Sequence, residues 1–211
     1  MIITHHQKQF FKLQLGDTVI AVNPISKESK SVDKPARFGS TISLSTVRHA
    51  DYNGVESVTY NNQEPFIIDS PGSYEVDDIF IRGLESKTEI DDKSYINTIY
   101  TFEFDGITIL YLGHLISREL DSNVREAIEN VDVVFVPVSS TTLSATDAYK
   151  LATSFEPKAI IPTEYDEKKD AEALQKFLKE GGDDSVKSVD KLTIKQKNIA
   201  EMSGDIVVIS S

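Results

Sequence analysis

The sequence contains no cysteine among its 211 residues. The protein therefore has neither a disulfide framework nor a thiolate metal site. The chain also lacks a hydrophobic run long enough to cross a membrane, and its first residues, MIITHHQKQFFKL, lack the pattern of a secretory signal. These absences predict a cytoplasmic protein with no membrane partner.

Basic residues are outnumbered by acidic ones. The 22 Lys and Arg residues stand against 34 Asp and Glu, which gives a net charge of -12. Because a nucleic-acid backbone needs a basic face, we expect no nucleic-acid partner. The content of 39% hydrophobic and 27% charged residues is typical of a globular protein, and the length predicts one domain over residues 1–211.

The first half of the chain has the pattern of β-hairpins. Strand-like runs at 10–15 and 18–22 flank Gly16-Asp17, and runs at 97–104 and 107–112 flank Asp105-Gly106; both dipeptides favour tight turns. The run 42–45 alternates Ile and Leu with Ser, which also suits a strand. Further strands are predicted at 55–60, 65–69, 73–76 and 79–83, and a polar loop at 85–94.

The second half alternates strands with helices. Helices are predicted at 117–130, at 144–155 with a capping box from Ser144 and Asp147, and at 170–180. Two sheets with helices outside account for both halves of the chain, which predicts an α/β (α+β) fold. The strands of this half are predicted at 131–138, 159–162, 192–194 and 206–209.

Three of the apolar strands end in polar loops that carry candidate functional residues. His49 and Asp51 follow the first of these strands, in ISLSTVRHADYNG, while His114 follows ITILYLG and Glu164 follows AIIPT. Such loops gather at one edge of a sheet, where α/β sites tend to form. This set suits a divalent cation such as zinc, manganese or iron. The alternative is that each residue is solvated or has a structural role.

Several phrases spread over the chain are similar to those of one protein family: GDTVIAVNP, ISLSTVRHADYNG, SPGSYEV with IFIRG, INTIYTFEFDGITILYLGH, VDVVFVPV and EPKAIIPTEYD. Through them the chain resembles the metallo-β-lactamase superfamily, specifically its branch of small metal-dependent hydrolases that includes ascorbate-phosphate lactonases. The resemblance spans nearly the whole chain. It implies a four-layer αββα sandwich.

The resemblance also implies that one of the family's two metal sites is lost. Family members carry a His-x-His-x-Asp-His stretch at the central loop, and here its four ligand positions fall on Val47, His49, Asp51 and Tyr52. A further family histidine should fall within 84–89, where this chain has none. Of the metal site that uses these histidines, only His49 is retained.

The second metal site of the family keeps more of its donors. The family's bridging Asp becomes His114 and its final His becomes Glu164, so Asp51, His114 and Glu164 would supply three ligands, with His49 nearby. Three protein ligands and an open position are the composition of a catalytic mononuclear site. Catalytic roles would then fall on His49 or Asp51 for proton transfer and on Tyr52 as a hydrogen-bond donor to an oxyanion.

Two functions follow as alternatives. The first is a hydrolase of a small phosphate ester or lactone, with at most one divalent metal and a small-molecule substrate. The second is a non-catalytic relative that has lost the metal and binds a ligand or another protein. The two differ in whether Asp51, His114 and Glu164 converge on a cation or make hydrogen bonds to protein groups.

Overall fold

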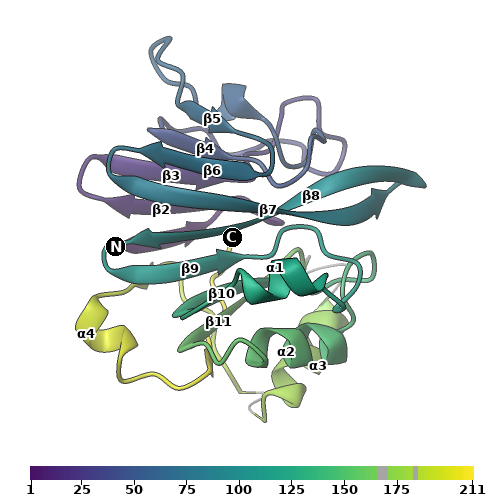
Figure 1. Cartoon of the computed structure of the whole chain (residues 1–211). Helices are drawn as coiled ribbons and strands as arrows, with labels where there is room; N and C mark the ends of the chain where they lie inside the picture. The colour runs from purple at the N-terminus through teal and green to yellow at the C-terminus, as the bar shows by residue number, and fades with distance from the viewer. Residues whose placement is uncertain (166–170, 183–184) are drawn as a thin grey trace.

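The computed structural model describes residues 1–165, 171–182 and 185–211. Two mixed β-sheets pack against each other with helices on one side, which confirms the predicted fold class (Figure 1). In the first sheet, neighbouring strands are β12 (Leu192–Thr193), β1 (Ile2–His5), β2 (Phe11–Leu15), β3 (Thr18–Val22), β4 (Ile42–Leu44) and β5 (Phe66–Ile68).

The second sheet combines parallel and antiparallel strands. Strands β9, β10, β11 and β13 run parallel, and β6 to β9 form an antiparallel meander. The parallel strands place their carboxyl ends at one edge of the sheet. In spatial order the strands are β13 (Asp205–Ile206), β11 (Ala159–Thr163), β10 (Val133–Pro137), β9 (Ile107–Tyr111), β8 (Lys93–Phe104), β7 (Ile79–Ile90) and β6 (Gly72–Val76).

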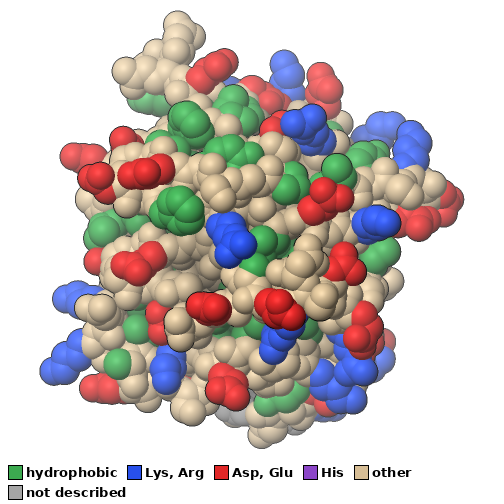
Figure 2. Space-filling view, viewed as in Figure 1, with side chains coloured by type: hydrophobic (Ala, Val, Ile, Leu, Met, Phe, Trp, Pro, Cys, Tyr) green, Lys and Arg blue, Asp and Glu red, His purple; other side chains and the backbone are tan. Residues whose placement is uncertain are grey.

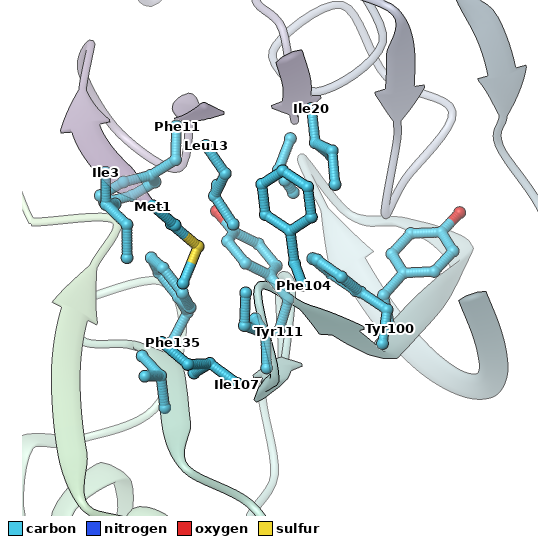
Figure 3. Packing of buried hydrophobic residues seen from close by; sticks show 14 of the residues in the cluster. Met1, Ile3, Phe11, Leu13, Ile20, Tyr100, Phe104, Ile107, Tyr111 and Phe135 are labelled. Carbon is cyan, nitrogen blue, oxygen red and sulfur yellow. The ribbon is translucent and has the colours of Figure 1, made fainter. Parts of the chain in front are cut away.

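The main hydrophobic core lies between the sheets because both contribute their alternate apolar side chains to it. Ile3, Phe11 and Leu13 come from the first sheet, and Tyr111 and Phe135 from the second. Figure 3 shows these side chains converging from opposite layers. The core therefore fixes the two sheets relative to each other beneath the loops at their edges.

Helices α1 (Ser122–Glu126), α2 (Ala145–Thr153) and α3 (Ala171–Glu180) cover the outer face of the second sheet (Figure 1). Ser144 caps α2 by accepting a hydrogen bond from the backbone N–H of Asp147, as the sequence predicts. On the first sheet, the segment 25–38 forms the cover instead, with a small cluster that includes Phe10, Ile25 and Phe38. Two other helices lie elsewhere: α4 (Gln196–Ile199) contributes Ile199 to the core between the sheets, and the 3-10 helix η1 (Val55–Ser57) is bonded to the segment 25–38 through Ser57.

Some predicted elements need correction. The polar loop predicted at 85–94 is wrong: β7 and β8 continue through it and turn only at Asp91 and Asp92, both in the left-handed region with φ of 50° and 59°. Much of this ribbon is exposed, so it lacks the apolar alternation that indicates a strand.

Three other predicted elements are shorter or of another type. The helix predicted at 117–130 shrinks to α1, because Asp121 before it is extended; Leu120 still packs on the core, but from irregular chain. The strand predicted at 55–60 is the 3-10 helix η1, and the one at 206–209 is reduced to β13. Asp170, the predicted start of α3, lies outside the described residues.

The surface is polar and acidic. Figure 2 shows acidic side chains spread over the viewed face, with Lys, Arg and separate hydrophobic side chains between them. Among the described helices, none is long and apolar enough to span a membrane.

Candidate functional site

The loops at one edge of the sheets enclose a cleft of about 880 Å³. The predicted site residues His49, Asp51, Tyr52, His114 and Glu164 all line it. They arrive from the loops after β4, β9 and β11, because the strands that precede them end at this edge. The structure therefore brings together residues that are far apart in the sequence.

Lys8, in the turn between β1 and β2, occupies the centre of the charged part of this cleft. Its Nζ lies 2.8 Å from Oδ2 of Asp51 and 3.1 Å from Oε1 of Glu164. Both carboxylates belong to residues that are only 6% exposed. The cation that the two acidic side chains surround is thus an ammonium of the protein itself, which the sequence analysis missed.

The charges of Lys8, Asp51 and Glu164 shift one another's pKa values. Burial alone would lower the pKa of Lys8, but the carboxylates of Glu164 and Asp51 outweigh it and leave that pKa raised. Burial raises the pKa of Glu164, and Lys8 only partly offsets this effect. For Asp51, burial raises the pKa, but Lys8 and neighbouring hydroxyls reverse the effect and leave it lowered. Lys8 and Asp51 therefore form an ion pair at neutral pH.

Hydroxyl groups complete the surroundings of the two carboxylates. Ser29 and Ser31 donate hydrogen bonds to Oδ1 and Oδ2 of Asp51 at 2.5 and 2.6 Å. The Tyr52 hydroxyl donates to Oε1 of Glu164 at 3.1 Å. Oε2 of Glu164 is buried and has no hydrogen-bond partner among the described residues. Both carboxylate oxygens of Asp51 thus have hydrogen-bond partners, whereas Oε2 of Glu164 has none among the described residues.

The two histidines lie beside this cluster. His114 Nδ1 is 2.8 Å from the Thr88 hydroxyl oxygen, and its ring packs edge-on against Tyr52. Burial and the charge of Lys8 lower the pKa of His114 to about 4, so its imidazole is neutral at pH 7. His49 Nδ1 faces the backbone N–H of Asp51 at 3.3 Å, and the His49 ring contacts Tyr95.

The residues of the cleft do not fit a resident metal as they are arranged. Asp51 and Glu164 already bind the Lys8 ammonium, and the family's first ligand position is the apolar, 1% exposed Val47. In residues 1–165, 171–182 and 185–211, no three His, Asp or Glu side chains stand close enough to share an ion. The predicted ligands therefore share a cleft without forming a coordination shell.

A buried polar network positions the loops of the site. The Asn97 side chain accepts from the backbone N–H of His114 at 2.8 Å and donates to Leu112 O at 3.0 Å. Gln9 donates to Gly113 O at 3.1 Å and accepts from Asn23 at 3.0 Å. These bonds connect the turn that carries Lys8 to the loop that carries His114. Single buried amides carry no motif, and so the sequence analysis missed them.

Gly113 has no room for a side chain. Its φ is +66°, and a Cβ would lie 2.3 Å from Asn97 Oδ1 and 2.8 Å from Thr46 Cβ. We expect Gly113→Ala to lower the free energy of unfolding by about 2–4 kcal/mol, from overpacking and backbone strain together. Urea denaturation measures this loss. The matched control is Gly16→Ala, which has a similar φ of +57° but no atom within 4 Å. Equal losses in the two variants would contradict the steric argument.

Comparisons with known proteins agree with this fold. A family model described as the β-lactamase superfamily domain matches residues 2–164. A solved structure from Thermotoga maritima, of a proposed Zn-dependent hydrolase of the metallo-β-lactamase superfamily, has 26% identity and a TM-score of 0.76, and the match covers 99% of this chain and 97% of that chain. Among curated protein sequences, none matches.

Two further structures show the same fold at lower identity. A proposed metal-dependent hydrolase from Parabacteroides distasonis has 17% identity and a TM-score of 0.64, covering 98% of this chain and 91% of that chain. A metallo hydrolase from the archaeon Ignicoccus hospitalis has 15% identity and a TM-score of 0.60, covering 92% and 99%. The narrower resemblance to ascorbate-phosphate lactonases stays a prediction. The chain belongs to the metallo-β-lactamase superfamily.

Proposed function

We propose that this protein binds a small molecule in its cleft without a resident metal, and that Lys8 supplies the positive charge of the site. The observation that carries the proposal is the contact of one ammonium with two buried carboxylates, Asp51 and Glu164. A metal could bind these two carboxylates only by displacing the Lys8 ammonium, which would then lose both of its ion-pair partners.

The dimensions and polarity of the cleft support a small-molecule ligand. Its volume of about 880 Å³ lies within the usual range of ligand pockets. Its wall offers neutral His114, the Tyr52 ring and the Thr141 side chain. The net charge of -12 argues against a nucleic acid, so small molecules remain the expected partners.

A metal-dependent hydrolase of a small phosphate ester or lactone is the second candidate. It is favoured by the family and by the similar structures, two of which are described as proposed metal-dependent hydrolases. Asp51, His114 and Glu164 would have to hold one zinc, manganese or iron ion, which would supply an activated water. That arrangement requires Lys8 to leave both carboxylates.

Elemental analysis separates the two candidates. We expect untagged protein, purified without chelators, to contain well under about 0.1 equivalent of zinc, manganese and iron, and to take up none on dialysis against zinc or manganese. The matched control is the double variant Asp51→Ala, His114→Ala, which should give the same values. About one equivalent in the wild type that the variant loses would overturn the proposal and establish the metal-dependent hydrolase.

Ligand binding is then tested on the same preparation. A panel of small phosphate esters, lactones, carboxylates and amines is screened by the shift in melting temperature, since a ligand that binds the folded state raises it.

A further inference from the structure

The backbone holds Lys8 at its position in the cleft. Gln7 and Lys8 both adopt positive φ, at 104° and 53°, a backbone conformation that residues other than glycine rarely adopt. The Lys8 carbonyl accepts a hydrogen bond from the backbone N–H of Glu164 at 3.0 Å and lies 3.0 Å from His5 Nε2. The turn is therefore tied to the same residue whose carboxylate its ammonium contacts.

Glu164 is held in the same way. Its φ is +66°, again in the left-handed region, and its backbone N–H is the donor to Lys8. Strained conformations of this kind are costly and persist where the surrounding structure determines them. Lys8 and Glu164 are thus joined twice, by a backbone hydrogen bond and by the contact of their side chains. The fold itself therefore determines their ion pair.

Without the ammonium, the cleft would need another cation. Two buried carboxylates close to a common point repel each other when both are charged. Ser29 and Ser31 donate hydrogen bonds to Asp51, and Glu164 has an oxygen with no partner among the residues described. Carboxylate oxygens with an imidazole nitrogen nearby form a donor set for divalent transition metals.

His114 lines the same cleft and carries an imidazole. When Nδ1–H donates to the Thr88 hydroxyl, Nε2 carries the lone pair, and such a second hydrogen bond commonly orients a metal-binding histidine.

We infer that Lys8 is a built-in counterion that excludes divalent metal from this cleft, and that its removal leaves the two carboxylates around its position, Asp51 and Glu164, able to hold Mn²⁺ or Zn²⁺ in its place. The inference rests on the proposed metal-free function and adds the residue that enforces it. Lys8 is a positioning residue for the two carboxylates.

The test compares metal uptake by Lys8→Met and wild type. Met keeps the length and apolar character of the lysine stem but has no charge. In equilibrium dialysis against Mn²⁺ and separately Zn²⁺, we expect Lys8→Met to bind about one equivalent. Its melting temperature should rise by about 5–10 °C at a hundredfold excess of metal over the Kd. The wild type should show neither change.

Two controls locate the effect. Lys12→Met removes a lysine whose ammonium lies over the Phe38 ring, outside the cleft, and should behave as wild type. Adding Asp51→Asn and Glu164→Gln to Lys8→Met should abolish the uptake. If Lys8→Met fails to fold alone, refolding in the presence of Mn²⁺ but not of Mg²⁺ gives the same answer, and Lys8→Gln serves as a second variant.

The outcomes distinguish the inference from the proposed function. Metal bound by the wild type overturns both. A wild type without metal, together with Lys8→Met and Lys8→Gln variants that fold and bind none, overturns the inference alone. Uptake that persists after the two carboxylates are neutralised also overturns it, because the metal would then bind elsewhere.

Discussion

Lys8→Met is expected to lower the free energy of unfolding at pH 7 by about 3–5 kcal/mol, among the largest effects of any single substitution in this protein. The reason is that Asp51 and Glu164 are each 6% exposed and would lose their only ion-pair partner among the described residues. Urea denaturation followed by far-UV circular dichroism, in metal-free buffer, measures the change.

A double-mutant cycle shows whether the loss comes from the carboxylates. Adding Glu164→Gln to Lys8→Met removes one stranded charge and should recover part of the stability, which a simple loss of packing would not allow. Lys12→Met should cost no more than about 1 kcal/mol, because its cation–π contact with Phe38 is partly exposed. If Lys12→Met and Lys8→Met cost the same, the ion pair does not support the fold.

The pH dependence of this loss has a definite sign. Burial raises the pKa of Glu164 from its usual value of 4.5, and losing Lys8 would raise it further. A carboxyl group with a raised pKa costs stability above its unfolded pKa and none once it is protonated in both states. The deficit of Lys8→Met should therefore shrink as the pH falls from 7 toward 4.5. A deficit that grows with acid would contradict this account.

The pairing of two strands was predictable where a short turn of characteristic residue types connects them. Gly16 and the Asp105-Gly106 pair sit in left-handed conformations, so residue types alone indicate the two hairpins. The ends of β4, β9 and β11 were predictable for a related reason: buried strands are apolar, and the polar residues that follow them mark their ends. The same signals place His49, Asp51, His114 and Glu164 after strand ends, and in the structure these residues line one cleft.

Lys8 was not predictable in this way, because its role depends on contacts with residues distant in sequence. Asp51 and Glu164 follow it by 43 and 156 positions, and a single lysine in a turn carries no motif. The positive φ of Gln7 and Lys8 has no signal in their residue types either. The sequence therefore indicates the acidic residues and histidines of this site but not the Lys8 ammonium that the acidic residues bind.

A core substitution is expected to cause the second large loss of stability. The core residues concerned also contact the turn that carries Lys8. Phe135 on β10 is 1% exposed and contacts Phe11 and Tyr111 with ring centroids 5.1 and 5.0 Å apart. The Tyr111 hydroxyl in turn donates to the Gln9 carbonyl, next to Lys8, at 2.5 Å. Figure 3 shows Phe135 below Phe11 between the sheets. This cluster therefore supports the turn that presents the ammonium.

Phe135→Ala is expected to lower the free energy of unfolding by about 3–5 kcal/mol, the cost of a lost aromatic side chain and of the cavity that remains. Urea denaturation measures it, with Phe80→Ala as the matched control: Phe80 lies on β7 of the same sheet but is 58% exposed, so the same substitution should change stability by no more than about 0.5 kcal/mol. Similar losses in the two variants would mean that the contacts between the sheets do not govern stability. The turn carrying Lys8 would then be held mainly by its own hydrogen bonds to Glu164 and His5.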